Sequence, residues 1–205
     1  MHEFLLVDPK KSEDLYKFVY PIWSLVAAKY DIKKYREDIY NDLKNKFSAG
    51  MLTEELIEVA VRWKYGKLDH NRIPAQHEAI IENFCKILDK KDLHKKSVRN
   101  LIDVFDSIFS DAYVTKIFFA HLFKPSEIPI IDIHNYASLR YFGVNYCDPD
   151  KFKITNKSVS RTKNSILAQS QLLKMMIDDL SFLLKENTYE CDKFLMMFGK
   201  HLAPK

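Results

Sequence analysis

Asp132 and His134 are the residues of this chain whose types and positions are best suited to chemistry. A short apolar run, Ile128 to Ile131, ends at Asp132, and the helical pattern that follows makes this residue the start of a helix. The partial positive charge of a helix N-terminus keeps a carboxylate ionised. Such a charge can act electrostatically where bulk water is excluded. Asp is also a favoured N-cap residue, so an ordinary helix cap is the alternative that the sequence leaves open.

A second group of candidates lies in Arg-Trp-Lys-Tyr-Gly-Lys, residues 62–67, where basic and aromatic side chains alternate. This composition suits a surface on which a cation contacts phosphate and a ring stacks on a base. Lys64 and Lys67, together with Arg72, are therefore candidate phosphate contacts. Trp63 is a candidate for base stacking, but it also falls on the apolar stripe of its helix, which favours a place in the core.

Helical periodicity recurs along the chain and provides the elements that must position these residues. Thr53 and Ser97 have the side chains of N-caps, and Gly50 and Gly66 are typical of helix ends. No internal repeat and no alternation typical of a parallel sheet is present. The predicted helices cover approximately residues 12–26, 31–49, 53–65, 74–88, 97–109, 114–123, 132–143, 163–186 and 189–202, with a long surface loop at 144–162.

We predict a compact all-α protein over residues 1–205, and the composition allows one domain or two closely packed helical lobes. Apolar residues make up 47% of the chain and aromatic residues 13%, which is enough for a sizeable core. Only four Gly and seven Pro are present, which argues against a turn-rich all-β protein. Residues 97–143 form the hairpin-like segment and the candidate active-site helix. The formal net charge of +4 allows an anionic partner without requiring one.

The sequence gives no indication of a membrane partner, a metal or a cofactor. No segment approaches the ~20 apolar residues of a membrane span, and the apolar run near the N-terminus is too short for a signal peptide. Cys85, Cys147 and Cys191 lack a C-x-x-C spacing and are typical of reduced, mostly buried thiols in a cytoplasmic protein. The histidines lack metal-ligand spacing, and Walker A, dinucleotide-binding and serine-hydrolase motifs are absent. We therefore expect no cofactor.

A family resemblance adds to this interpretation. The segment Pro129-Ile130-Ile131-Asp132-Ile133-His134, continuing to Leu139-Arg140-Tyr141-Phe142-Gly143, resembles the P-V-D-x-H…R-L-G segment of helix-hairpin-helix DNA glycosylases. Thr115 lies where that family often has the Thr that opens its second hairpin helix. Pro125 lies where the bacterial proteins similar to 8-oxoguanine DNA glycosylase tend to have Pro. The clear match covers about thirty of the 205 residues.

The resemblance implies a two-lobed helical fold with Asp132 in the groove between the lobes. In that family the matching Asp stabilises the oxocarbenium-like sugar as the N-glycosidic bond breaks, or activates water. His134 matches a histidine that contacts the phosphate of the substrate strand, and the alternative is a histidine bonded locally in the first helical turn. The implied partner is double-stranded DNA with a modified base, which is turned out of the duplex and released.

Further side chains become candidate DNA contacts in this interpretation. Lys116 and Arg140 join Lys64, Lys67 and Arg72 as contacts to the backbone, although an Arg such as Arg140 is more often a solvated surface residue. Trp63, Tyr113 and Tyr136 are the candidates for stacking on the base.

Two departures from the family pattern limit what the resemblance implies. The hairpin Leu-Pro-Gly-Val-Gly is replaced by residues 109–113, Phe-Ser-Asp-Ala-Tyr, and glycines are what let a hairpin backbone approach phosphate. Val114 stands where bifunctional members carry the Schiff-base Lys, and Lys116 is roughly 200° further around the helix. These departures predict either a monofunctional hydrolase or a non-catalytic DNA-binding relative. A helical partner-binding module, such as part of a defence or toxin system, is the third possibility.

Overall fold

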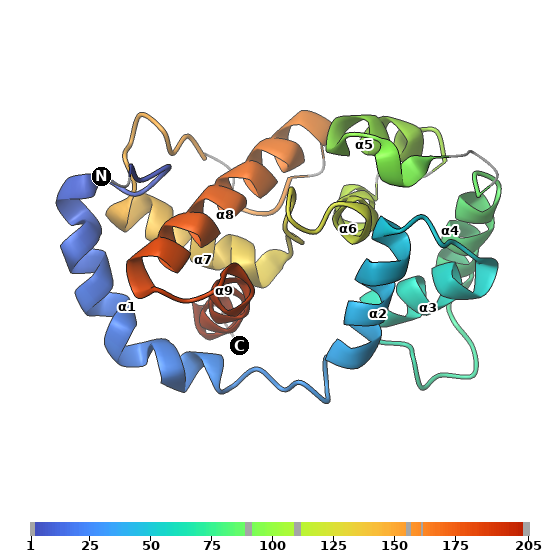
Figure 1. Ribbon diagram of the computed structural model, residues 1–205, viewed down its shortest axis with the longest axis horizontal. Coiled ribbons are helices and arrows are strands. Elements are labelled where there is room, and N and C mark those ends of the chain that lie inside the picture. The colour runs from blue at the N-terminus through green and yellow to red at the C-terminus, as the bar shows by residue number, and fades with distance from the viewer. Residues whose placement is uncertain (1–2, 89–91, 109–111, 155–156, 161, 203–205) are drawn as a thin grey trace. The chain divides into compact units, whose positions relative to one another are not determined.

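The computed structural model describes residues 3–88, 92–108, 112–154, 157–160 and 162–202, and these residues form an all-α protein. They contain no strand, and a bridge between Val7 and Cys147 is isolated. Contacts divide the chain into two compact units: unit 1 combines residues 1–31 with 131–205, and unit 2 is the continuous stretch 32–130 (Figure 1). None of the described helices has both the length and the apolar composition that a membrane crossing requires.

Local sequence signals explain several helix ends. The α-helices are α1 (Ser12–Ala27), α2 (Glu37–Ser48), α3 (Glu54–Lys64), α4 (Ala75–Cys85), α5 (Val98–Asp106), α6 (Tyr113–Phe123), α7 (Ile133–Tyr146), α8 (Lys163–Leu184) and α9 (Thr188–Leu202); short 3-10 turns lie at Pro9–Lys11 and Leu93–Lys95. Thr53 and Ser97 are confirmed as N-caps, because each side chain accepts a hydrogen bond from an amide three residues on. Gly50 and Gly66 follow α2 and α3 with φ of +73° and +62°, which glycine adopts without strain.

Unit 1 is built around α9, which packs against α1, α7 and α8 (Figure 1). An N-terminal arm, residues 4–8, belongs to the same unit, and its Leu6 and Val7 are fully buried. Asp179 of α8 is also fully buried, and its carboxylate accepts hydrogen bonds from the amides of Leu5, Leu6 and Val7 at 2.7 to 2.8 Å. A buried carboxylate therefore holds the arm against the helices.

Unit 2 has an aromatic core. Helix α2 packs against α3 and α6, α3 packs against α4, and α5 packs against α6. Five buried phenylalanines contact one another with ring centroids 4.6 to 6.4 Å apart: Phe47, Phe84, Phe105, Phe119 and Phe123. Burial of these large apolar rings is a major stabilising contribution in this unit.

Two predicted helix ends differ from the structure. The helix predicted from Asp31 starts at Glu37, because Arg36 adopts a left-handed conformation with a φ of +45°. Helix α7 does not end at Gly143 but continues to Tyr146. Gly143 instead makes room for the ring of Phe152, which a Cβ would approach to 2.0 Å. The predicted loop at 144–162 is correspondingly shorter, and its described residues beyond α7 contain no helix.

Candidate functional site

The N-terminus of α7, in unit 1, holds the candidate catalytic carboxylate. Asp132 is the N-cap, with extended backbone, and its Oδ1 accepts hydrogen bonds from the amides of His134 and Asn135 at 2.8 and 2.9 Å. The Asn135 Oδ1 in turn accepts a hydrogen bond from the Asp132 amide at 2.8 Å, which completes a capping box. The side chain of Asp132 therefore has a fixed orientation.

The two oxygens of this carboxylate have different surroundings. Oδ1 serves the cap, whereas Oδ2 receives no hydrogen bond from the residues that the structure describes. Asp132 is half-buried. The helix cap and a chemical role are thus compatible, because capping uses one oxygen and leaves the other available to a bound molecule.

His134 lies in the first turn of α7 and is half-buried. Its Nδ1 is buried and has no hydrogen-bond partner within the described part of the chain. Its backbone lies against α9 at Gly199: a Cβ on Gly199 would lie 1.8 Å from the His134 carbonyl oxygen. The absence of a side chain at Gly199 therefore permits the close approach of α9 that fixes the start of α7.

Replacing Gly199 by Ala is expected to destabilise unit 1 and to displace the first turn of α7. The new methyl would overlap the His134 backbone and lie 2.9 Å from the Ser138 Oγ, so the two helices must separate. Overpacking of this kind typically costs about 1–3 kcal/mol, and we expect a loss of about 2 kcal/mol in a urea titration. Gly66→Ala is the control, because nothing lies within 4 Å of its Cβ position and only backbone strain is added. An unchanged stability of the Gly199 variant would show that α9 does not constrain α7.

Tyr136, predicted to stack on a base, is a core residue instead. It is 2% exposed, and its hydroxyl accepts a hydrogen bond from Gln169 Nε2 at 3.0 Å. Burial raises its pKa above the usual value for tyrosine. The ring is buried because Tyr136 lies on the inward face of α7, as Ser138 and Leu139 do. Arg140 is half-buried, and its Nη1 donates to the Lys157 carbonyl at 3.1 Å.

The basic and aromatic segment at the end of α3, in unit 2, is only partly exposed. The Trp63 ring packs on Tyr40 and Phe118, with centroid distances of 4.8 and 5.7 Å, and its Nε1 donates to the Tyr35 carbonyl at 2.8 Å. Stacking on a base would require the indole to leave these contacts, so its role here is in packing. Lys64 lies over the Phe118 ring at 5.3 Å. Among the predicted phosphate contacts of unit 2, Lys64 and Lys67 are half-buried and Arg72 is exposed.

Lys116 was predicted to contact DNA phosphate, but the structure buries it. Its side chain is 2% exposed, and its Nζ forms an ion pair with Asp106 at 2.7 Å. The same Nζ lies 4.0 Å from the centroid of Tyr113, so this ring also takes part in an intramolecular cation–π contact. An ion pair within unit 2 has taken the place of the predicted phosphate contact. The hairpin residues Phe109, Ser110 and Asp111 lie outside the described residues.

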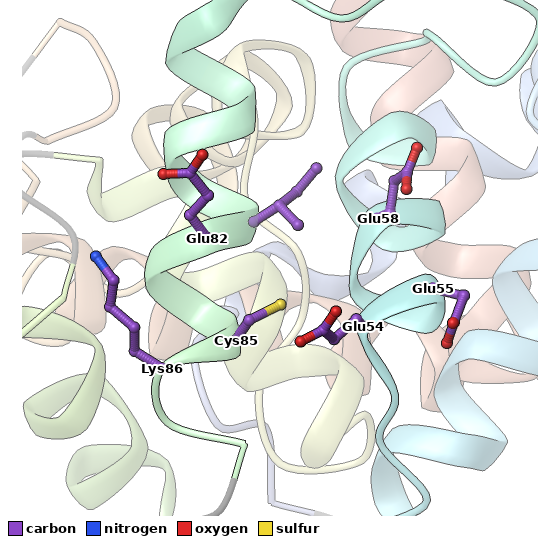
Figure 2. A pocket seen from close by; sticks show the side chains of 7 residues that line it. Glu54, Glu55, Glu58, Glu82, Cys85 and Lys86 are labelled. Atoms are coloured by element: carbon purple, nitrogen blue, oxygen red, sulfur yellow. The ribbon is translucent and has the colours of Figure 1, made fainter.

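An acidic cavity between α3 and α4 was not predicted from the sequence. Its volume is about 530 Å³, and it is lined by carboxylates from both helices together with Cys85 and Lys86. Figure 2 shows Glu54 of α3 and Cys85 of α4 facing each other across it. Burial, followed by the charges of Glu54 and Glu55, raises the pKa of the Cys85 thiol, so this thiol is a poor nucleophile.

Comparisons with known proteins add no assignment. Within the described residues, no group of three His, Cys, Asp or Glu side chains is arranged to hold a metal ion. No known protein family, curated protein or solved structure gave a significant match to this chain.

Proposed function

We propose that this chain is a cytoplasmic protein that binds double-stranded DNA and hydrolyses the N-glycosidic bond of a modified base. The observation that carries the proposal is the carboxylate of Asp132, which a capping box orients while its Oδ2 receives no hydrogen bond from the described residues. The order of elements supports it: α5, α6, an extended segment and an Asp-capped helix follow one another as in helix-hairpin-helix DNA glycosylases.

The proposed reaction is a hydrolysis without a covalent enzyme intermediate. The bond from the base nitrogen to the sugar C1′ breaks, and the departing base takes the electron pair and then a proton. Water supplies the hydroxyl group that bonds to C1′. Asp132 stabilises the positive charge that develops on the sugar, or accepts a proton from the attacking water. Val114 cannot form an imine, so no lyase step is included.

Contacts to the DNA backbone are assigned within each unit separately. In unit 1, His134 and Arg140 are the proposed phosphate contacts, since both lie on α7 and are half-buried. In unit 2 the proposed contacts are Lys64, Lys67 and Arg72, and Lys116 is left out because it pairs with Asp106. Such contacts raise affinity without selecting a sequence.

The test is the comparison of wild type with Asp132→Asn on duplexes that carry different modified bases, followed by alkali to cleave abasic sites. Asn is as good an N-cap as Asp, so this substitution keeps the fold and removes only the charge. We expect strand cleavage to fall at least about 100-fold, as for loss of a main electrostatic group. Asp150→Asn, at an exposed position of the same unit, is the control and should match wild type.

The outcomes separate catalysis from capping. If Asp132→Asn retains full activity while Asp132→Ala loses about 1 kcal/mol of stability, the residue is a cap and the catalytic assignment is wrong. If wild type cleaves none of the modified duplexes, the proposal of a glycosylase fails.

A non-catalytic DNA-binding protein is the second candidate, and the burial of Lys116 favours it. In such a protein Lys116 would not contact phosphate, and the hairpin would not need its glycines. A protein that does not carry out the glycosylase reaction could tolerate both changes. Binding to an unmodified duplex should then weaken steeply with salt, because phosphate contacts release counterions. Absence of any salt-dependent binding would contradict both DNA proposals and leave a helical partner-binding protein.

A further inference from the structure

One cavity in unit 2 is lined by uncharged side chains, unlike the other two cavities described for this unit. Its volume is about 350 Å³, and the side chains that matter for its chemistry are Tyr65, Gln76, His77, Ile80, Asn83 and Ile108. None of its lining residues is an Asp, Glu, Lys or Arg. The other two cavities described for this unit are lined by several carboxylates together with Lys or Arg. No ionised side chain therefore lines this cavity, and a cation adjacent to its wall is Lys86, whose Nζ donates to the Asn83 Oδ1 at 2.9 Å.

One face of α4 supplies much of the wall. Gln76, Ile80 and Asn83 stand at positions i, i+4 and i+7, so they share a helix face. The two residues that carry the carboxamides are about 10 Å apart along the helix axis, at 1.5 Å per residue. The Asn83 Oδ1 accepts a hydrogen bond from Lys86 Nζ at 2.9 Å, and the Gln76 Nε2 lies 3.5 Å from the His77 Nε2. The Asn83 Nδ2, a donor, and the Gln76 Oε1, an acceptor, are the atoms offered to a ligand, and the aliphatic Ile80 lies between the two residues. The wall thus presents a polar, an apolar and a second polar group in this order, which suits a ligand with apolar faces and polar edges.

His77 adds an aromatic group with a nitrogen that the protein does not use. Its ring stacks on Tyr65 at a centroid distance of 3.8 Å, and the residue is 7% exposed. Its Nδ1 has no hydrogen-bond partner in the described residues, whereas buried polar atoms in native proteins nearly always have one. Burial and the charge of Lys67 lower the pKa of His77, which favours the neutral imidazole. A neutral imidazole can donate at one nitrogen and accept at the other.

We propose that this cavity binds an uncharged heteroaromatic molecule of the size of a nucleobase or nucleoside. The volume lies at the lower end of the range for ligand pockets, which begins at about 300 Å³. A ring packed on Ile80 and Ile108 brings its polar edges to the carboxamides of Gln76 and Asn83, and the Tyr65–His77 pair extends the aromatic wall. A 5′-phosphate is disfavoured, because no Lys or Arg lines the cavity itself and the Lys86 ammonium is already bonded to Asn83. The inference does not depend on Asp132, which belongs to the other unit.

The test is a titration of the full chain with adenine, adenosine, hypoxanthine, inosine and adenosine 5′-monophosphate, followed by NMR. We expect at least one free base or nucleoside to shift the side-chain amide resonances of Gln76 and Asn83 and the ring resonances of His77. The monophosphate should bind about tenfold more weakly than its nucleoside. His77→Phe keeps an aromatic ring and removes both nitrogens, so it should weaken binding about tenfold, the effect of one lost hydrogen bond. Asn83→Asp should weaken it similarly, because it removes the Nδ2 donor while the contact of this side chain with Lys86 is kept.

Matched variants make the result decisive. Asn45→Asp changes an exposed amide on α2 and should bind as wild type does, and Asp132→Asn should also leave this binding intact. Backbone amide spectra of each variant establish that it is folded. If base and nucleoside cause equal shifts, the cavity binds the heteroaromatic ring alone. If only compounds with the sugar cause shifts, the site binds nucleosides. The proposal is overturned if no compound shifts these resonances at millimolar concentration, if the monophosphate binds most tightly, or if the folded His77→Phe and Asn83→Asp variants bind as wild type does.

Discussion

Replacing Asp179 by Ala should lower the free energy of unfolding by about 4 kcal/mol, a large effect for one side chain. The carboxylate is fully buried and accepts three hydrogen bonds from consecutive amides of the N-terminal arm, at 2.8, 2.7 and 2.8 Å. Its removal leaves these amides without their acceptor, each at a cost of about 1–3 kcal/mol if it stays buried. We expect the arm to detach, which exposes Leu6 and Val7 and limits the total loss.

Urea titration of wild type, Asp179→Ala and Asp179→Asn measures this effect. Asn keeps one acceptor oxygen but turns an amino group toward an N–H donor, so its loss should be intermediate. Asp178→Asn is the control at the neighbouring position: its carboxylate is about 30% exposed and pairs with Lys174, so we expect a change of at most about 1 kcal/mol. Hydrogen exchange at Leu6 and Val7 should accelerate only in the Asp179 variants. Unchanged protection there would contradict the proposed role of Asp179.

Helix identity was predictable from the sequence, because it depends on local signals. The caps at Thr53, Ser97 and Asp132 each occur where a short polar side chain precedes an apolar periodic run, and the structure has these bonds. The helix start at Glu37 was not predictable in this way. Ile32 and Tyr35 continue the apolar pattern of α2 backwards, but the left-handed Arg36 interrupts the helix between them and Glu37.

Asp179 illustrates the limit of periodicity as a guide to buried polar groups. In the sequence, Asp178 and Asp179 are equivalent acidic residues of a long helix. Only the tertiary position of the arm, more than 170 residues earlier in the chain, makes one of them an acceptor for backbone amides. Partners at this separation leave no local signal in a single sequence.

The sequence predicted the helix position of the candidate catalytic residue but not the burial of several predicted contact residues. The sequence correctly indicated that Asp132 starts a helix. It did not indicate that Lys116 faces Asp106, because a lysine on an apolar helix has the same appearance whether it is solvated or paired. Nor did it indicate that the ring of Tyr136 is buried, since Tyr is common in both environments.

His121 should make the stability of unit 2 depend on pH between about 6.5 and 4. The imidazole is buried, its Nδ1 contacts the Ile128 carbonyl at 2.6 Å, and its Nε2 contacts the Tyr40 hydroxyl. A carbonyl can only accept, so Nδ1 carries the proton and Nε2 accepts from Tyr40. Burial lowers the pKa of His121 from 6.5 to about 4, and the charges of Lys44 and Lys64 act in the same direction. Protonation would also convert the acceptor Nε2 into a second donor.

The sign follows from proton uptake. Below pH 6.5 the unfolded chain binds a proton at His121 while the folded chain does not, so acid favours unfolding until the folded group titrates near pH 4. A shift of this size corresponds to about 3 kcal/mol. We therefore expect the stability difference between wild type and His121→Gln to change by about 3 kcal/mol between pH 7 and pH 4, with wild type losing more. Other groups titrate in both proteins and cancel in the difference.

Tyr40→Phe separates ionisation of His121 from loss of its hydrogen bond. This variant removes the hydroxyl at Nε2 but keeps the ring that stacks on Trp63 and a titratable His121. It should be less stable than wild type at pH 7 and should retain the steep loss of stability toward pH 4. The His121→Gln curve alone should be flatter. If wild type and His121→Gln lose stability in parallel between pH 7 and pH 4, His121 is not kept neutral by burial, and another group must govern acid unfolding.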